Sequence, residues 1–192
     1  MNKLLAKRLA FYLTQTMDEL TEIKVCYFIE SVLNELEKLI VILLIFAYIK
    51  KMDCGVVIII VLLLLRVYIG GYHCNTYIGC LVYSIIMCFV PVILNEIVEI
   101  SQWFWLISEA AVAGYILLLA PLQNRKRPVY SRKKRRDFKI MAMLILLFSN
   151  VFGVCFPKYL DVITITHMVI LLNSFIGEIK ERGGGEHEGI IS

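Results

Sequence analysis

Residues 54–80 read CGVVIIIVLLLLRVYIGGYHCNTYIGC, and this stretch decides the fold. It begins with an uncharged apolar run from Cys54 to Leu65, and Gly70-Gly71 then interrupts the pattern at a position where a membrane helix would end. Backbone groups left unpaired at such a break must reach water or be buried in protein. The stretch therefore predicts two membrane helices joined by a break.

The composition of the whole chain agrees with a membrane protein. Of 192 residues, 59% are hydrophobic and 19% are charged, whereas soluble domains contain about 45–50% apolar and about 25% charged residues. A compact soluble globule with this composition would have too few polar side chains to cover its surface. The composition also excludes a disordered chain, a collagen and a disulfide-stapled secreted domain, and the six cysteines form no CxxC pair.

The hydropathy pattern predicts an all-α polytopic membrane protein, formed by residues 1–192 as a single integral-membrane domain. Residues 1–31 carry an apolar stripe interrupted by charges, which is typical of an amphipathic helix lying in the membrane interface. A span needs about 20 mostly apolar residues, and residues 32–177 supply six candidates. Residues 178–192 are expected to form a flexible cytoplasmic tail. The six predicted spans are 32–49, 54–71, 74–95, 102–122, 140–157 and 159–177.

The distribution of positive charge predicts the orientation. Nine of the 20 Lys and Arg residues lie between Arg125 and Lys139, and positive loops stay in the cytoplasm. Alternation then places both termini inside, and the loops near 50–53, 95–101 and 157–160 outside. This asymmetry is read as membrane orientation, so no nucleic-acid partner is expected.

His73 and Cys80 are the candidate catalytic residues. An imidazole can take the proton of a thiol, and the thiolate then attacks a carbonyl carbon. On one straight helix residues seven apart are displaced by about 10.5 Å, which is too far for a hydrogen bond. Catalysis therefore predicts a helix break within residues 70–76, with His73 directed toward Cys80 in a cleft open to the cytoplasm. The alternatives are an interfacial histidine that caps a turn and a buried structural cysteine.

Three further ionisable residues lie within predicted spans. Arg66 precedes His73 by seven residues, so it would lie at a depth similar to Cys80 if the chain turns near His73. There it would stabilise a thiolate or hold a substrate carboxylate, although it could equally snorkel to the inner headgroups. Glu109 and His167 are interpreted as satisfied structural polar groups rather than catalysts.

The sequence resembles the accessory gene regulator B (AgrB) family. The resemblance rests on Arg66, Gly70-Gly71, His73, Thr76 and Cys80 in a six-span chain, and on Ala120-Pro121-Leu122-Gln123-Asn124-Arg125-Lys126-Arg127-Pro128. It covers nearly the whole chain. Cys74 departs from the family pattern, in which a small residue usually follows the histidine, and places a second thiol beside the site.

The resemblance implies a multi-pass cysteine endopeptidase of the bacterial cell membrane that processes a quorum-sensing propeptide. Cys80 would be the nucleophile and His73 its base, and Arg66 and Gly71 match other positions that the family needs. The partners implied are a short amphipathic AgrD-like propeptide, the lipid bilayer and a second copy in a homodimer. No cofactor and no metal are expected. The alternative function is a small transporter or exporter of a peptide or ion, with Arg66, Glu109 and His167 lining its path, and a non-catalytic scaffold is a third interpretation.

Overall fold

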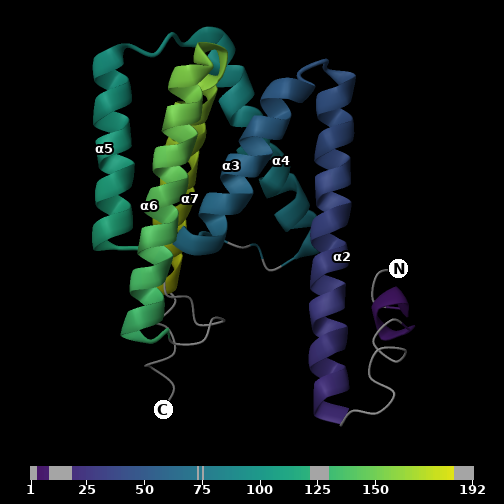
Figure 1. The fold of residues 1–192 in the computed structure, drawn as a ribbon. Coiled ribbons are helices and arrows are strands. Elements are labelled where there is room, and N and C mark those ends of the chain that lie inside the picture. Colours follow the sequence, from purple (N-terminus) through teal and green to yellow (C-terminus); the bar gives the residue numbers. More distant parts are fainter. Residues whose placement is uncertain (1–3, 9–18, 73, 75, 122–129, 184–192) are drawn as a thin grey trace. The chain divides into compact units, whose positions relative to one another are not determined.

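The computed structural model describes residues 4–8, 19–72, 74, 76–121 and 130–183, and these form helices joined by short connections, without strands. The prediction of an all-α protein is confirmed for these residues (Figure 1). Residues 4–8 form a short helical segment. The longer elements are α2 (Glu19–Tyr48), α3 (Met52–Ile69), α4 (Tyr77–Ile97), α5 (Gln102–Leu118), α6 (Arg132–Cys155), a 3₁₀ turn (Pro157–Tyr159) and α7 (Leu160–Gly183).

The chain divides into two compact units, residues 1–50 and residues 51–192. In the first unit α2 is a continuous helix of 30 residues. It therefore contains no break at residues 31 and 32, where the interfacial segment was expected to meet the first span. Lys38 and Glu35 form an ion pair one turn apart on this helix.

Four helices of the second unit are long and apolar enough to cross a membrane, namely Met52–Ile69, Tyr77–Ile97, Arg132–Cys155 and Pro157–Lys180. They coincide with the predicted spans at 54–71, 74–95, 140–157 and 159–177. The predicted span at 102–122 corresponds to α5, which is apolar but 17 residues long. The count of six spans and the cytoplasmic location of both termini stay predictions.

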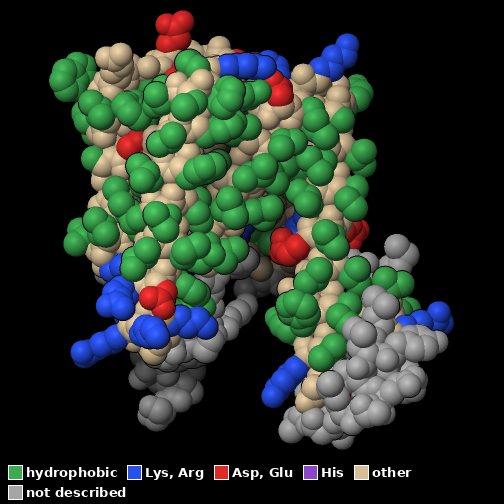
Figure 2. Space-filling model, viewed as in Figure 1, with side chains coloured by type: hydrophobic (Ala, Val, Ile, Leu, Met, Phe, Trp, Pro, Cys, Tyr) green, Lys and Arg blue, Asp and Glu red, His purple; other side chains and the backbone are tan. Residues whose placement is uncertain are grey.

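The outer surface of the second unit is apolar along the helices. Figure 2 shows hydrophobic side chains covering α5 and α6, while Lys and Arg gather at the end where α6 begins. On α6 large apolar side chains such as Leu147, Phe148 and Val154 are exposed. A contiguous apolar surface of this kind is unfavourable in water and is the expected outer face of a protein surrounded by lipid.

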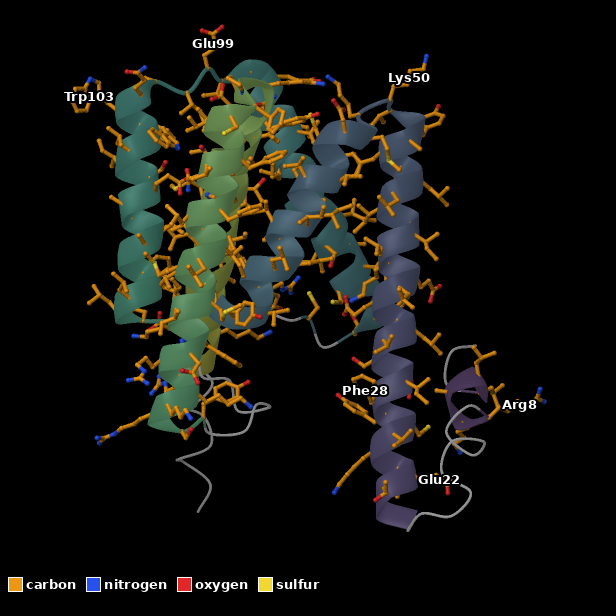
Figure 3. The ribbon with its side chains drawn as sticks, viewed as in Figure 1. Arg8, Glu22, Phe28, Lys50, Glu99 and Trp103 are labelled. Atoms are coloured by element: carbon orange, nitrogen blue, oxygen red, sulfur yellow. The ribbon has the colours of Figure 1, made fainter. Side chains whose placement is uncertain are left out.

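Two ion pairs show which loops of the second unit share one end. Lys51 Nζ lies 2.8 Å from Glu96 Oε1, and Lys158 forms an ion pair with Asp53. These contacts join the start of α3, the end of α4 and the start of α7, as predicted for loops on the same side of the membrane. Figure 3 shows Glu99 and Trp103 at this end, with Glu99 pointing away from the helices.

The opposite end of the second unit carries the break between α3 and α4. Lys180, near the end of α7, donates a hydrogen bond to the Tyr72 hydroxyl at 2.9 Å. Lys139, near the start of α6, donates to the carbonyl of Leu117, near the end of α5. Successive helices from α3 to α7 therefore alternate in direction (Figure 1), as the topology prediction requires for this part of the chain.

Helix α7 is the centre of the second unit and packs against α3, α4, α5 and α6. In its most apolar window 61% of the residues are buried, compared with 22–39% for the other three candidate spans. Residues 162–167 are all buried. Polar side chains on α7 therefore face protein rather than lipid, and both polar clusters described below depend on them.

Candidate active site at the break between α3 and α4

The helix break is the feature that defines the site. Helix α3 ends at Ile69 and α4 begins at Tyr77, and the described residues between them are not helical. Gly70 has φ 89° and ψ −168°, a backbone conformation open mainly to glycine, while its N–H donates to the Arg66 carbonyl at 3.0 Å. The predicted break within residues 70–76 is confirmed for these residues.

His73 lies outside the described residues. The prediction that its imidazole is directed toward the Cys80 sulfur therefore stays a prediction. Its chain neighbours Tyr72 and Cys74 are both described, so the backbone on either side of the histidine is placed.

Cys80 lies in the first turn of α4. Thr76 is the N-cap residue in extended conformation, and its Oγ1 accepts a hydrogen bond from Gly79 N at 3.2 Å. Cys80 N donates to the Thr76 carbonyl at 3.0 Å. The Cys80 side chain is half-buried, and the sulfur is thus carried by the end of a helix whose N-terminus has partial positive charge.

A second thiol lies against the same turn. A Cβ atom added at Gly79 would be 3.7 Å from Cys74 Sγ. Cys74 is half-buried, as Cys80 is, and none of the six cysteines, all of them described, forms a disulfide. The structure thus places Cys74 beside the residue that precedes Cys80.

Tyr72, which precedes His73, is held through its backbone and its side chain. Arg66 Nη2 donates to the Tyr72 carbonyl at 2.7 Å. The Tyr72 hydroxyl accepts from Lys180, whose Nζ also lies 4.5 Å from the ring centroid. The Tyr72 and Tyr83 rings meet edge to face at 5.4 Å. Arg66 therefore binds the backbone of the break, whereas its predicted action on the thiolate or on a substrate carboxylate stays a prediction.

Asn173 of α7 completes this cluster. Its Oδ1 accepts hydrogen bonds from Tyr72 N at 3.2 Å and from the Tyr83 hydroxyl at 2.8 Å. Its amide also lies so close to Gly71 that a Cβ there would overlap it. Next to it, Ser174 Oγ lies 3.4 Å from the Gly70 carbonyl. A side chain at position 71 would therefore displace the Asn173 amide, and the expected need for glycine there stays a prediction.

Sequence reasoning did not identify Tyr72, Tyr83, Asn173 or Lys180. The available signal was an asparagine within the apolar stretch of the last predicted span, because a buried polar group in a membrane protein needs a partner. Neither spacing nor composition could name that partner, since Asn173 is 101 residues from Tyr72.

A second polar cluster lies where α5, α6 and α7 meet. His167 Nδ1 lies 2.9 Å from Glu109 Oε1, and His167 Nε2 lies 3.0 Å from Ser149 Oγ. Asn150 Nδ2 donates to Glu109 Oε2 at 2.8 Å, and Trp105 Nε1 donates to Asn150 Oδ1 at 3.0 Å. The His167 side chain is fully buried and that of Glu109 is 12% exposed. The two ionisable residues predicted to be structural are therefore partners of one another.

The hydroxyl of Ser149 shows what this cluster does. Its Oγ lies 2.9 Å from the carbonyl oxygens of Ile145 and Leu146, in addition to its contact with His167. A hydroxyl has one hydrogen and carbonyl oxygens only accept, so two helix carbonyls compete with His167 Nε2 for the Ser149 hydrogen. A serine nucleophile needs its hydrogen directed to the histidine. The cluster therefore joins three helices and supports the structural interpretation of Glu109 and His167.

Comparison with known proteins agrees with this architecture. The sequence model of the family described as Accessory gene regulator B matches residues 5–176. The chain belongs to the AgrB family. It is also 30% identical over 152 residues to an AgrB-like protein of Clostridium beijerinckii, covering 77% of this chain and 75% of that protein. No solved structure matches the chain.

Membership of the AgrB family supports two statements about the chain. It has a role in the agr quorum-sensing system, and the family in general acts as a peptidase in propeptide processing. The family and the apolar helices together support a membrane protein with an AgrD-like propeptide as its partner.

Proposed function

We propose that this AgrB protein is a membrane-embedded cysteine endopeptidase that cleaves an AgrD-like propeptide and promotes cyclisation of the product to a thiolactone. The observation that carries the proposal is the helix break, because α3 ends at Ile69 and α4 begins at Tyr77. No single straight helix therefore imposes a separation of about 10.5 Å between residues 73 and 80. Family membership supplies the substrate class.

The reaction follows from the chemistry of a thiol and an imidazole. His73 takes the Cys80 proton, the sulfur attacks the scissile carbonyl carbon, and the C–N bond breaks. The C-terminal segment leaves as an amine that takes the proton from His73, and an acyl-enzyme thioester remains. A cysteine thiol within the peptide then attacks this thioester, forms the ring and returns a proton to Cys80. One thioester replaces another in this second step, so it needs no nucleotide.

The surroundings of the break support this chemistry. Cys80 lies at the N-terminal end of α4, where the helix dipole stabilises a nearby anion. Water competes with the peptide thiol for the thioester, and a site enclosed by protein at the membrane surface would restrict its access. Gly71 and Arg66 contribute by allowing α7 to approach and by holding the Tyr72 carbonyl.

The decisive experiment uses the full-length protein in proteoliposomes with an AgrD-like propeptide, and mass spectrometry to detect cleaved and cyclised peptide. Cys80→Ala should abolish cleavage while the protein stays inserted, and Cys80→Ser should leave at most a trace. Cys74→Ala is the matched control, because its thiol lies beside the same turn. Full cleavage by Cys80→Ala with loss in Cys74→Ala would transfer the role of nucleophile to Cys74.

We also propose that the site faces the cytoplasm and that the protein acts as a homodimer. In intact cells a thiol placed at Glu99 should react with an impermeant reagent, and one placed at Lys133 should react only after permeabilisation. Both positions lie outside the apolar parts of the helices. The reverse labelling pattern would place the break on the outer side.

A further inference from the structure

Asn173 joins three parts of the second unit through one side-chain oxygen. Its Oδ1 accepts from Tyr72 in the break and from Tyr83 in α4, while Asn173 itself belongs to α7. The residue is 1% exposed, and its Nδ2 is buried without an acceptor in the described part of the chain. A buried donor without a partner costs stability, so packing alone does not favour asparagine here.

We propose that Asn173 is a positioning residue for the reaction at Cys80, and this inference rests on the proposed function. Tyr83 lies three residues after Cys80 on α4, which places it one turn away on a neighbouring part of the helix surface. Tyr72 directly precedes His73. One acceptor atom therefore ties the neighbour of the candidate base to the helical turn that follows the candidate nucleophile.

Three side chains bind Tyr72, and each binds a different group of it. Arg66 holds the Tyr72 carbonyl and Lys180 its hydroxyl, but Asn173 is the partner of the Tyr72 amide. Residues 70–72 belong to no helix that would hold them in place. Gly71 lets the Asn173 amide reach the backbone. Without Asn173 the Tyr72 amide would lose its partner on α7, and Ser174 and Lys180 would be left as the α7 contacts of this segment. A displacement of about 1 Å in an active site can cost on the order of 100-fold in rate.

The test compares Asn173→Leu with Asn173→Asp in the full-length protein. Two quantities are measured, namely kcat and KM for propeptide cleavage, and the rate at which iodoacetamide alkylates Cys80 at neutral pH, followed by peptide mass spectrometry. Asn173→Leu should lower kcat on the order of 100-fold with little change in KM, and should slow alkylation as much as His73→Ala does. Asn173→Asp keeps the two acceptor contacts and should retain both rates within a few-fold.

Asn150→Leu is the matched control, because it makes the same substitution in the cluster of α5, α6 and α7. It should lower the unfolding temperature and leave the alkylation rate of Cys80 unchanged. If Asn173→Leu folds and keeps the parent kcat and alkylation rate, the positioning role is overturned. If Asn173→Asp lowers kcat and the alkylation rate as much as Asn173→Leu does, the role cannot be assigned to Oδ1.

If Asn173→Leu does not fold, Asn173→Ser decides. A serine in a helix bonds the carbonyl four residues earlier, and its side chain is too short to accept from both Tyr72 and Tyr83. Slower alkylation of Cys80 in this variant would support the proposal, and the parent rate would reject it. The alkylation measurement needs no propeptide. Normal cleavage by Cys80→Ala would therefore overturn the proposed function, whereas an unchanged alkylation rate in folded Asn173→Leu would overturn the positioning role alone.

Discussion

The break between α3 and α4 and the junction of α5, α6 and α7 both bury polar groups among apolar helices, but they use them differently. At the junction, side chains bond mainly to side chains, as Glu109, His167 and Ser149 do. At the break, the side chains of Arg66 and Asn173 bind the backbone of Tyr72. The junction therefore fastens regular helices together, and the break fixes the path of an irregular chain.

This difference teaches which cluster should govern chemistry. Regular helices satisfy their own backbone groups, so the junction adds stability without setting the direction of the chain. An irregular segment has no internal hydrogen-bond ladder, so its conformation depends on the side chains that bind it. Substitutions at the break are therefore expected to change kcat, and substitutions at the junction are expected to change unfolding.

Among the substitutions that compare the break with the junction, the largest effect is expected for Gly71→Ala. The added methyl group would overlap the Asn173 amide, so this side chain must shift and its hydrogen bonds to Tyr72 and Tyr83 are disturbed. Cleavage should then fall on the order of 100-fold. The measurement is kcat for propeptide cleavage by the reconstituted protein. Gly114→Ala is the matched control, because a Cβ at Gly114 meets no atom within 4 Å. Normal cleavage by Gly71→Ala would show that the approach of α7 is not required.

Arg66→Lys should have the next largest effect. Lysine keeps the positive charge but not the planar fork of arginine, so the Tyr72 carbonyl would lose a hydrogen bond of 2.7 Å. We expect cleavage to fall about tenfold or more, as for other misplaced active-site groups. Cleavage assays that also include Arg66→Met separate the effect of the positive charge from the effect of the hydrogen-bond geometry. If Lys is fully active and Met is inactive, charge rather than geometry is what the site needs.

His167→Leu should change stability rather than chemistry. It leaves the Glu109 carboxyl without its histidine partner, and a buried polar group that loses its partner costs about 1–3 kcal/mol. Replacing both residues by leucine should cost less than the single change, because no unpaired carboxyl remains. Thermal unfolding of the parent, the two single leucine variants and the double variant measures the cost of the single change and of the double change. Loss of cleavage in the folded fraction would show that the junction also serves the reaction.

The smallest effect is expected at the opposite end of the second unit. Glu96 lies beside Lys51 and raises the pKa of its amine from the ordinary value of 10.5. The ion pair therefore contributes at neutral pH, and the contribution of Lys51 is lost as the pH rises through its raised pKa. Glu96→Gln should leave cleavage unchanged and barely move the unfolding temperature, because exposed ion pairs contribute little. A drop in cleavage would indicate that this end communicates with the break.

The break itself was predictable, because Gly70-Gly71 interrupts an apolar run and glycine is needed where φ is 89°. The alternating direction of α3 to α7 was predictable from hydropathy and from the loops. The partners of Arg66 and Glu109 were not. Hydropathy reports that a polar group is buried in a span but carries no information about which helix faces it.

The sequence by itself determined the membrane class, the four long apolar helices and the positions of Gly70 and Cys80, because these depend on local composition and on backbone conformation. Only the tertiary structure decided that Tyr72 is held by Asn173, that the Asn173 amide lies against Gly71, and that Glu109 pairs with His167. Each of these contacts joins residues between 58 and 102 positions apart. Such pairings depend on how the helices pack around α7. A buried polar group without a hydrogen-bond partner costs free energy, so the stable packing is one that gives these groups partners.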